Sequence, residues 1–236
     1  MYRAMLMGLW AVWATAGAAH AQGDDPVVVE LFTSQGCSSC PPADANLVKL
    51  SARPDVLALS FGVTYWNYLG WEDTFARPEF TQRQFDYERP LGHAGAFTPQ
   101  IVVNGARDTV GHDLGEIEAL IADAAAERAI GPAVTANDER VTISAGAAPA
   151  GPADIWLVRY DPGLSEVPVA RGENRRRVLT IAHAVRELTR LGTWNGTETV
   201  LALPPASSPA GSWNSALLVQ LQRGGPILAA RKLGPS

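Results

Sequence analysis

The chain has 236 residues, and 47% of them are apolar, a proportion that supports well-packed globular structure and excludes a disordered protein. The 19 Lys and Arg residues against 24 Asp and Glu residues give a net charge of −5. This mild acidity argues against nucleic acid or an anionic membrane as the binding partner. The one dense basic cluster, Arg175–Arg177, is interpreted as a solvated turn.

The first 21 residues have the features of a secretory signal peptide. Arg3 precedes an apolar stretch at 4–19, and Ala19-His20-Ala21 fits the small-x-small rule for signal peptidase. A membrane anchor is the alternative, but the stretch is short for a span and the polar segment 22–25 follows it directly. We therefore expect residues 1–21 to be cleaved after Ala21. The mature protein would then be periplasmic or secreted, with no stable membrane anchor.

The only two cysteines, Cys37 and Cys40, form a C-x-x-C motif. They lie between a strand-like run at Val27–Phe32 and a helix-like run at Ala43–Ala52. A second strand-like run follows at Val56–Val63, so the segment predicts a βαβ unit with two parallel strands. A C-x-x-C motif beside such a unit is typical of thioredoxin-type redox sites.

An aromatic, irregular segment occupies residues 64–97. The elements predicted from this segment onward are a helix at Phe80–Glu88, a strand at Ile101–Val103, a hairpin turn at Asn104-Gly105 and a helix at Gly115–Ile130. This order, βαβ, insertion, β-hairpin and α, predicts an α/β thioredoxin-like domain over residues 22–131, with 64–97 as an aromatic insertion.

The composition shifts after Gly131-Pro132 to strand-sized runs divided by Gly and Pro turns. The predicted strands are Arg140–Ser144, Asp154–Tyr160, Thr199–Leu203, Ser215–Gln222 and Ile227–Lys232. The segment Arg177–Leu191 fits a helical face or strands, and we interpret it as strand. Residues 132–236 are thus predicted to form a β-rich, sandwich-like C-terminal domain. It has no cysteine, so we expect it to contribute no catalytic residue.

Four sequence blocks carry a resemblance to a known family. They are VELFTSQGCSSCPPAD (29–44), SFGVTYWNYLGWEDTFA (60–76), FTPQIVVNG (97–105) and GENRRRVLTIAHAVRELTRLGTWNG (172–196). The chain resembles the exported bacterial family catalogued as domain of unknown function 1223. The resemblance implies a thioredoxin-like domain with an appended β-rich part, and no established activity. That family commonly has His and Asp where this chain has Gly62 and Thr64, so no role of those side chains is carried over.

Three uses of the cysteine pair compete. A structural disulfide closing so short a ring would restrain the unfolded chain by only about 2 kcal/mol. A structural zinc site needs four ligands, and besides Cys37 and Cys40 the sequence offers only histidines scattered along the chain. The redox use is favoured. In that use Cys37 lies at the helix start with a partly exposed sulfur, activated mainly by the helix N-terminus, and attacks the substrate. Cys40, more buried and one turn into the helix, resolves the mixed disulfide.

Further site residues are predicted around the pair. Pro99 begins the strand that would lie beside the cysteines, and we expect the Thr98–Pro99 peptide to be cis, although trans proline is commoner among proteins at large. Thr98 would offer backbone groups to a bound substrate. In the aromatic insertion, Trp66 and Trp71 either pack in the core or line a substrate groove.

Two carboxyl groups near the pair are interpreted differently. Glu30, in the first strand, is either buried beneath the cysteines, with a raised pKa and able to take the proton of Cys40, or solvated on an exposed face. Asp44 follows Cys40 by four residues, on the same helical face. We interpret Asp44 as a first-turn dipole partner or a surface acid.

The leading hypothesis is an exported thiol–disulfide oxidoreductase that acts on protein or small-molecule thiols. It would need no cofactor beyond the Cys37–Cys40 disulfide, and a membrane thiol reductase is a candidate electron donor. The alternative is a thioredoxin-like binding protein, for copper or a protein partner, with a non-catalytic cysteine pair; no metal site is assigned. A third hypothesis is an interaction module that binds through its β-rich half.

Overall fold

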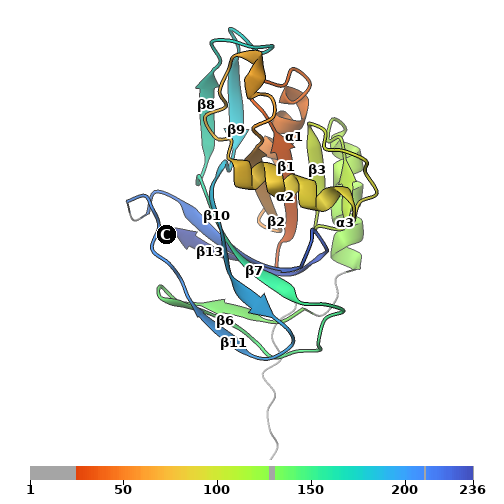
Figure 1. The fold of residues 1–236 in the computed structure, drawn as a ribbon, viewed down its shortest axis with the longest axis vertical. Helices are drawn as coiled ribbons and strands as arrows, with labels where there is room; N and C mark the ends of the chain where they lie inside the picture. The colour runs from red at the N-terminus through yellow and green to blue at the C-terminus, as the bar shows by residue number, and fades with distance from the viewer. Residues whose placement is uncertain (1–24, 128–130, 210, 236) are drawn as a thin grey trace, which may run out of the picture.

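The computed structural model describes residues 25–127, 131–209 and 211–235 (Figure 1). The predicted signal peptide, 1–21, lies outside the described residues. The first half forms, in order, β1 (Val27–Thr33), α1 (Pro41–Ser51), β2 (Val56–Gly62), the 3-10 helix η1 (Asn67–Leu69), α2 (Pro78–Glu88), β3 (Gln100–Val103), β4 (Arg107–Thr109) and α3 (Leu114–Ala126). In the described ranges no helix is long and apolar enough to cross a membrane.

A four-stranded sheet in the order β2-β1-β3-β4 forms the centre of the first half. Strands β1 and β2 are parallel, with Val27 opposite Val56, as the βαβ pattern predicted. Strand β3 is antiparallel to β1 and forms the expected hairpin with β4. Alternate residues of β1 face different layers: Val29 and Leu31 pack against α1 and α3. Val28 belongs to the opposite face, which α2 and the C-terminal sheet cover.

The second half is β-rich, as predicted. It forms β5 (Val134–Ala136), β6 (Arg140–Ile143), β7 (Ala153–Tyr160), β8 (Leu164–Pro168), β9 (Val178–Ala182), β10 (Val185–Trp194), β11 (Thr199–Ala202), β12 (Asn214–Leu221) and β13 (Ile227–Pro235). A sheet in the order β10-β7-β12-β13 faces a smaller one, β11-β6-β5, across a shared apolar core. The larger sheet also covers the first sheet through Val158 and Leu218, so the two halves share a continuous core.

Strands β8 and β9 form a hairpin that stands apart from the sandwich. In Figure 1 this hairpin lies beside α1, at the end of the molecule opposite β6 and β11. Two contacts with Ser60 of β2 attach it to the first sheet. The Ser60 N–H donates to the His183 carbonyl at 3.1 Å, and Ala184 forms a parallel bridge with Ser60. Strands β9 and β10 confirm the strand interpretation of Arg177–Leu191. The C-terminal half therefore reaches back to the part of the molecule that holds the cysteines.

Candidate functional site

The cysteines lie in a tight turn between β1 and α1. The Cys37 N–H donates to the Ser34 carbonyl at 3.1 Å, and the Cys40 N–H donates to the Cys37 carbonyl at 3.3 Å. We predicted Cys40 one turn inside the helix, but it is the N-cap residue, because α1 begins at Pro41. Pro41 and Pro42 fit the first turn because the N–H groups of that turn have no intrahelical acceptor.

Three side-chain donors stabilise the Cys37 thiolate. Thr98 Oγ1 donates to Cys37 Sγ at 3.3 Å, and Ser39 Oγ lies 3.2 Å from the same sulfur. The hydrogen bond from the Cys40 thiol is the strongest influence. With the Ser39 and Thr98 contacts it outweighs burial and lowers the pKa of Cys37 to about 6. Cys37 is therefore the group suited to exist as a thiolate at neutral pH.

The helix N-terminus is not the main activator that we predicted. Pro41 and Pro42 carry no N–H, and the N–H groups of Ala43 and Asp44 both donate to the Cys40 carbonyl, at 3.0 and 3.1 Å. The first turn of α1 therefore offers the thiolate no free N–H. The hydroxyl and thiol groups around the sulfur stabilise the thiolate instead.

Both cysteines are buried, with 1% of Cys37 and 0% of Cys40 exposed. The prediction of a partly exposed Cys37 sulfur is wrong for this conformation. Ser39 Oγ lies 3.2 Å from the sulfur and 3.3 Å from the Thr98 carbonyl oxygen, so its one hydrogen serves either acceptor and the side chain closes the turn against the entry to β3. Ser38 and Ser39 themselves are exposed, so the turn lies at the surface and its sulfur just beneath it.

Asp44 lies in the first turn of α1, as one of its two interpretations predicted, but it is a buried acid next to Cys40 and not a surface acid. Only 4% of Asp44 is exposed, and its Oδ1 accepts a hydrogen bond from Thr33 Oγ1 at 2.9 Å. Its Oδ2 is buried without a partner among the described residues. Burial raises the pKa of Asp44 to about 8. Burial also raises the pKa of Cys40 far above its usual value, and the charges of Cys37 and Asp44 add to this effect.

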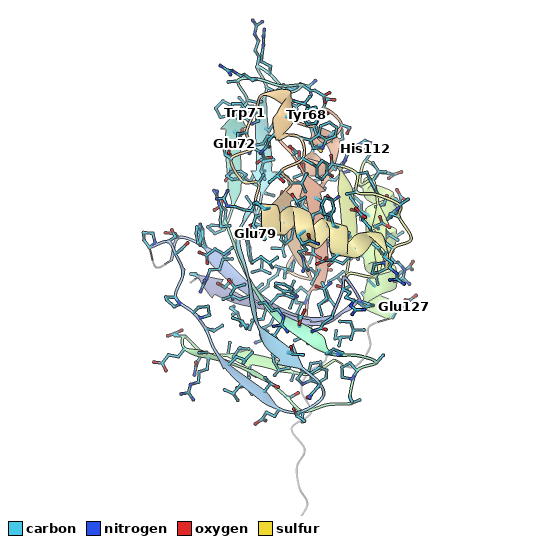
Figure 2. All side chains as sticks on the ribbon, viewed as in Figure 1. Tyr68, Trp71, Glu72, Glu79, His112 and Glu127 are labelled. Atoms are coloured by element: carbon cyan, nitrogen blue, oxygen red, sulfur yellow. The ribbon has the colours of Figure 1, made fainter. Side chains whose placement is uncertain are left out.

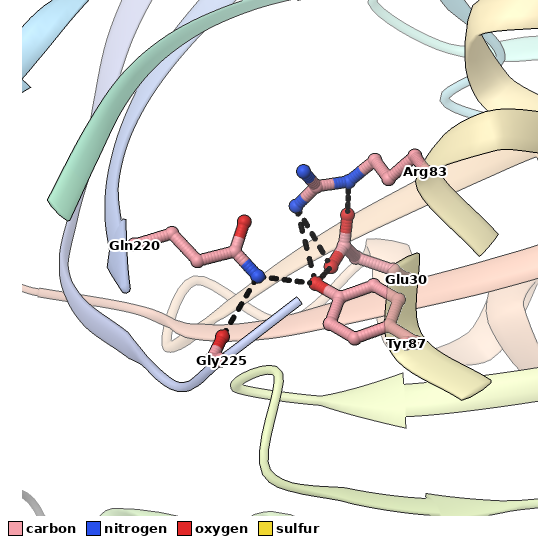
Figure 3. A network of polar contacts seen from close by, with 5 residues as sticks. All are labelled: Glu30, Arg83, Tyr87, Gln220 and Gly225. Carbon is pink, nitrogen blue, oxygen red and sulfur yellow. Dashed lines mark hydrogen bonds and ion pairs between the residues drawn. The ribbon is translucent and has the colours of Figure 1, made fainter. Parts of the chain in front are cut away.

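Glu30 is buried and does not lie on an exposed face. Its hydrogen bonds join it to residues other than the cysteines (Figure 3). Its carboxylate pairs with Arg83 of α2, whose Nε and Nη2 donate to Oε1 and Oε2 at 2.6 and 3.1 Å. The Tyr87 hydroxyl donates to the same carboxylate, and Gln220 of β12 donates to that hydroxyl at 2.9 Å. With both oxygens held by a guanidinium, Glu30 is a structural ion pair that joins the two halves. Its predicted role as proton acceptor from Cys40 is wrong.

Thr98 and Pro99 lie beside Cys37, as the order of elements predicted. The Thr98–Pro99 peptide is cis. The Thr98 side chain contributes more than the backbone groups that we expected, because its hydroxyl donates to Cys37 Sγ and accepts from Trp66 Nε1 at 2.7 Å. Trp66 therefore fixes the orientation of the hydroxyl that contacts the thiolate.

Trp71 supports the segment before the cysteines. Its Nε1 donates to Gln35 Oε1 at 2.9 Å, and the Gln35 N–H donates to Asp73 Oδ2 at 2.7 Å. Figure 2 shows Trp71 and Tyr68 at the same end of the molecule, and Trp71 packs against an apolar cluster of β8 and β9 residues. Trp71 thus links the cysteine turn to the C-terminal hairpin, whereas Tyr68 is largely exposed.

Residues of the C-terminal half hold the cysteine turn, which the sequence analysis missed. Asn174, 0% exposed, donates through Nδ2 to the carbonyls of Cys37 and Gln35 at 2.8 and 3.1 Å. The Glu173 carboxylate accepts the Ser38 N–H at 3.0 Å. These bonds reach the backbone of the turn, so Asn174 and Glu173 are positioning residues. The only signal in the sequence was the GEN segment within a block of the family resemblance.

Gly62, at the position where the family commonly has histidine, has no space around it for a side chain. A Cβ on Gly62 would lie 2.8 Å from the backbone nitrogen of Ala76, closer than atoms pack. Thr64, at the other departing position, bonds Thr81, with 3.0 Å between the two hydroxyl oxygens. Among the described residues no group of three or more His, Cys, Asp or Glu side chains could hold a metal ion. His112 contacts the Ser39 carbonyl at 2.8 Å.

Comparison with known proteins gives the family. A family model described as "Protein of unknown function (DUF1223)" matches residues 28–222. The chain belongs to this family. The match confirms the resemblance that the sequence blocks carried, and no curated protein matches the chain.

Solved structures resemble the chain over most of its length. The crystal structure of a protein from Agrobacterium tumefaciens is 35% identical, with a TM-score of 0.74, over 90% of this chain and 96% of that one. HBP35 of Porphyromonas gingivalis is 13% identical, with a TM-score of 0.62, over 91% of this chain and 76% of that one. The second likeness concerns the fold alone. The first extends across both halves, so their combination is shared with that relative.

Proposed function

We propose that this protein is an exported thiol–disulfide oxidoreductase whose first half has a thioredoxin-like layout. The parallel β1-α1-β2 unit, the β3–β4 hairpin and α3 support that layout, with Pro99 entering β3 beside Cys37. One observation carries the proposal: the two thiols of the pair have opposite pKa shifts. The pKa of Cys37 is lowered to about 6 and that of Cys40 is raised, which assigns attack to Cys37 and resolution to Cys40.

In the first step the Cys37 thiolate attacks one sulfur of a substrate disulfide. A bond forms between the two sulfurs, and the second substrate sulfur leaves as a thiolate. Because Cys37 is covered, the Ser39 contact with the Thr98 carbonyl must open for the substrate to approach. The freed carbonyl can then accept a hydrogen bond from a substrate N–H, the backbone role that the sequence assigned to Thr98.

In the second step Asp44 first releases its own proton to solvent, then accepts the proton of Cys40, and the Cys40 sulfur attacks Cys37 Sγ. The Cys37–Cys40 bond forms, the remaining substrate sulfur leaves as a thiolate, and two electrons have passed from the protein dithiol to the substrate. Asp44 suits this transfer because one of its oxygens is unpaired and the Thr33 hydroxyl contacts both groups. The Cys37 charge contributes to the raised pKa of Asp44 and is absent in the mixed disulfide, so Asp44 ionises more readily at this stage.

Trapping the mixed disulfide tests the proposal. Reduced native protein, Cys40→Ser and Cys37→Ser are each treated with 2,2′-dithiodipyridine, an uncharged disulfide, and analysed by intact mass. Native protein should end with an internal disulfide and no adduct, while Cys40→Ser should retain one adduct on Cys37. Cys37→Ser should react slowly or not at all. A stable adduct on the native protein, or capture that does not depend on Cys37, would contradict the proposal.

A further inference from the structure

A cluster of four exposed arginines lies on the connection between β8 and β9. Its members are Arg171, Arg175, Arg176 and Arg177, here called the arginine turn. The sequence alone indicates a solvated turn at Arg175–Arg177, because nothing in the sequence places it near the cysteines. In the fold it is next to them, although 137 positions separate Cys37 from Asn174.

The arginine turn is fixed to the cysteine turn. Asn174, fully buried, binds the Cys37 carbonyl at 2.8 Å, and Glu173 binds the Ser38 N–H at 3.0 Å. Arg175 follows Asn174 directly, so its Cα is about 3.8 Å from that of a residue bonded to Cys37. The backbone of the turn is also held, because the Arg176 N–H donates to the Val169 carbonyl at 2.8 Å. The backbone that carries these arginines is therefore held at the edge of the site.

The positive charge of the turn is largely uncompensated. Arg171, Arg175 and Arg176 form no ion pair within the described part of the chain, and Arg177 Nη1 bonds the Asn174 side chain at 3.2 Å. The turn itself contains one acid, Glu173, and the loop of Trp71, whose Cβ lies 3.5 Å from the position of a Cβ on Gly172, carries exposed Glu72 and buried Asp73. Exposed Arg77 lies on that same loop. The site edge is thus basic in a chain whose net charge is −5.

We propose that the arginine turn selects substrates that carry carboxylates beside the reactive sulfur, as in an acidic peptide disulfide. This inference rests on the proposed oxidoreductase function. Guanidinium groups bind carboxylates through paired hydrogen bonds, and a fixed positive edge raises the rate of encounter with an anion. The attraction acts on the first step, before the Cys37 thiolate attacks, and leaves the resolving step by Cys40 unchanged.

Two disulfide probes that differ in charge test the inference. One is 5,5′-dithiobis(2-nitrobenzoate), which has a carboxylate next to each sulfur, and the other is uncharged 2,2′-dithiodipyridine. With either probe, Cys37 bonds one sulfur and releases the other half, as a coloured thiolate from the dicarboxylate probe and as an ultraviolet-absorbing thione from dithiodipyridine. Cys40 then releases the second half as the protein disulfide forms. The second-order rate of the first release is followed on the reduced full chain.

The test variant is Arg171→Gln/Arg175→Gln/Arg176→Gln. It spares Arg177, which bonds Asn174. At an ionic strength of about 0.01 M, where charges act over about 30 Å, the variant should react about 5- to 10-fold more slowly with the dicarboxylate probe. Its rate with the uncharged probe should equal that of the native protein. At about 1 M salt the difference between variant and native protein should vanish.

A matched control removes the same charge elsewhere. Arg140→Gln/Arg223→Gln/Arg231→Gln changes three exposed arginines of the C-terminal half, and Arg223, like Arg176, has a positive φ. This control should keep native rates with both probes. Equal loss in control and test variants would mean that only net charge matters, and no loss in the test variant would exclude selection by the turn. In both cases normal reaction with the uncharged probe would leave the oxidoreductase proposal intact, whereas no Cys37 reaction with either probe would overturn that proposal as well.

Discussion

Two buried carboxyl groups, Glu30 of β1 and Asp44 of α1, differ in how their oxygens are paired. Glu30 has both oxygens bonded, to the Arg83 guanidinium and the Tyr87 hydroxyl. Asp44 has one oxygen bonded to Thr33 and the other buried without a partner among the described residues. The first carboxylate has an opposite charge to balance it, and the second has only a hydroxyl.

Burial alone therefore does not identify a functional acid. The Glu30 carboxylate has both oxygens hydrogen-bonded and a guanidinium beside it, so its contacts are those of a structural ion pair. An acid with a raised pKa and an open oxygen, beside a thiol that must lose its proton, is suited to accept that proton. The Glu30 network therefore joins the two halves, whereas the contacts of Asp44 support the role beside Cys40 that we propose for it.

The largest effect is expected from Arg83→Met, which leaves the Glu30 carboxylate buried without its cation. We expect a loss of about 3–5 kcal/mol in the free energy of unfolding, measured by urea denaturation. The double variant Glu30→Gln/Arg83→Met should recover part of this loss, because no unpaired charge remains. The pKa of Cys37 should stay unchanged in folded protein. A marked change in that pKa would show that the two buried centres are coupled and would contradict their separation.

Asp44→Asn should act in the opposite direction and stabilise the reduced protein at neutral pH. The folded pKa of about 8 lies above the usual 3.8, so the folded state keeps a proton that the unfolded chain has released. Stability from this group therefore falls as pH rises from about 4 towards 8, and asparagine removes the loss. We expect a gain on the order of 2–4 kcal/mol at pH 7 that vanishes below pH 4.

Glu30→Gln is the matched control for Asp44→Asn, since it also replaces a buried carboxyl with an amide. It should destabilise the protein at pH 7, because it leaves Arg83 without its anion. Unfolding curves of both variants across the pH range give the comparison. If the two substitutions changed stability in the same direction, the distinction between the two carboxyl groups would be lost.

Thr98→Val should have the smallest effect on stability and a clear one on the thiol. It removes the hydroxyl that donates to Cys37 Sγ, so the pKa of Cys37 should rise by about one unit. Thr98→Ser keeps a hydroxyl and should retain most of the native value. The change is measured by alkylation of Cys37 against pH, and an unchanged pKa in Thr98→Val would remove Thr98 from the stabilising donors.

The sequence predicts those parts of the site that local patterns specify. The turn from β1 into α1 holds both cysteines within a few residues, so periodicity and proline placement locate it. The contact of Pro99 with this turn follows from the order of elements, because the β3 strand pairs with β1. The βαβ unit and the strands of the C-terminal half follow from the same kind of pattern.

Such local patterns do not predict contacts between segments that are distant in the sequence. Helical spacing places Asp44 on the face of Cys40 but does not say which layer covers that face. Glu30 binds Arg83, which is 53 positions away in the sequence, and Asn174 binds Cys37, which is 137 positions away. No rule of sequence spacing indicates either contact. The sequence patterns therefore indicate neither the ion pair of Glu30 with Arg83, nor the burial of Asp44, nor the contacts of the β8–β9 connection with the cysteine turn.

The most direct test of the account is alkylation of the reduced native protein by iodoacetamide as a function of pH, with the modified cysteine identified by peptide mass. We expect Cys37 alone to react, with a half-maximal rate near pH 6, because Cys40, Ser39 and Thr98 stabilise its thiolate. Cys40 should stay unmodified until the protein unfolds. A Cys37 rate that rises only near the pKa of a free cysteine, about 8.5, or preferential modification of Cys40, would contradict the central claim.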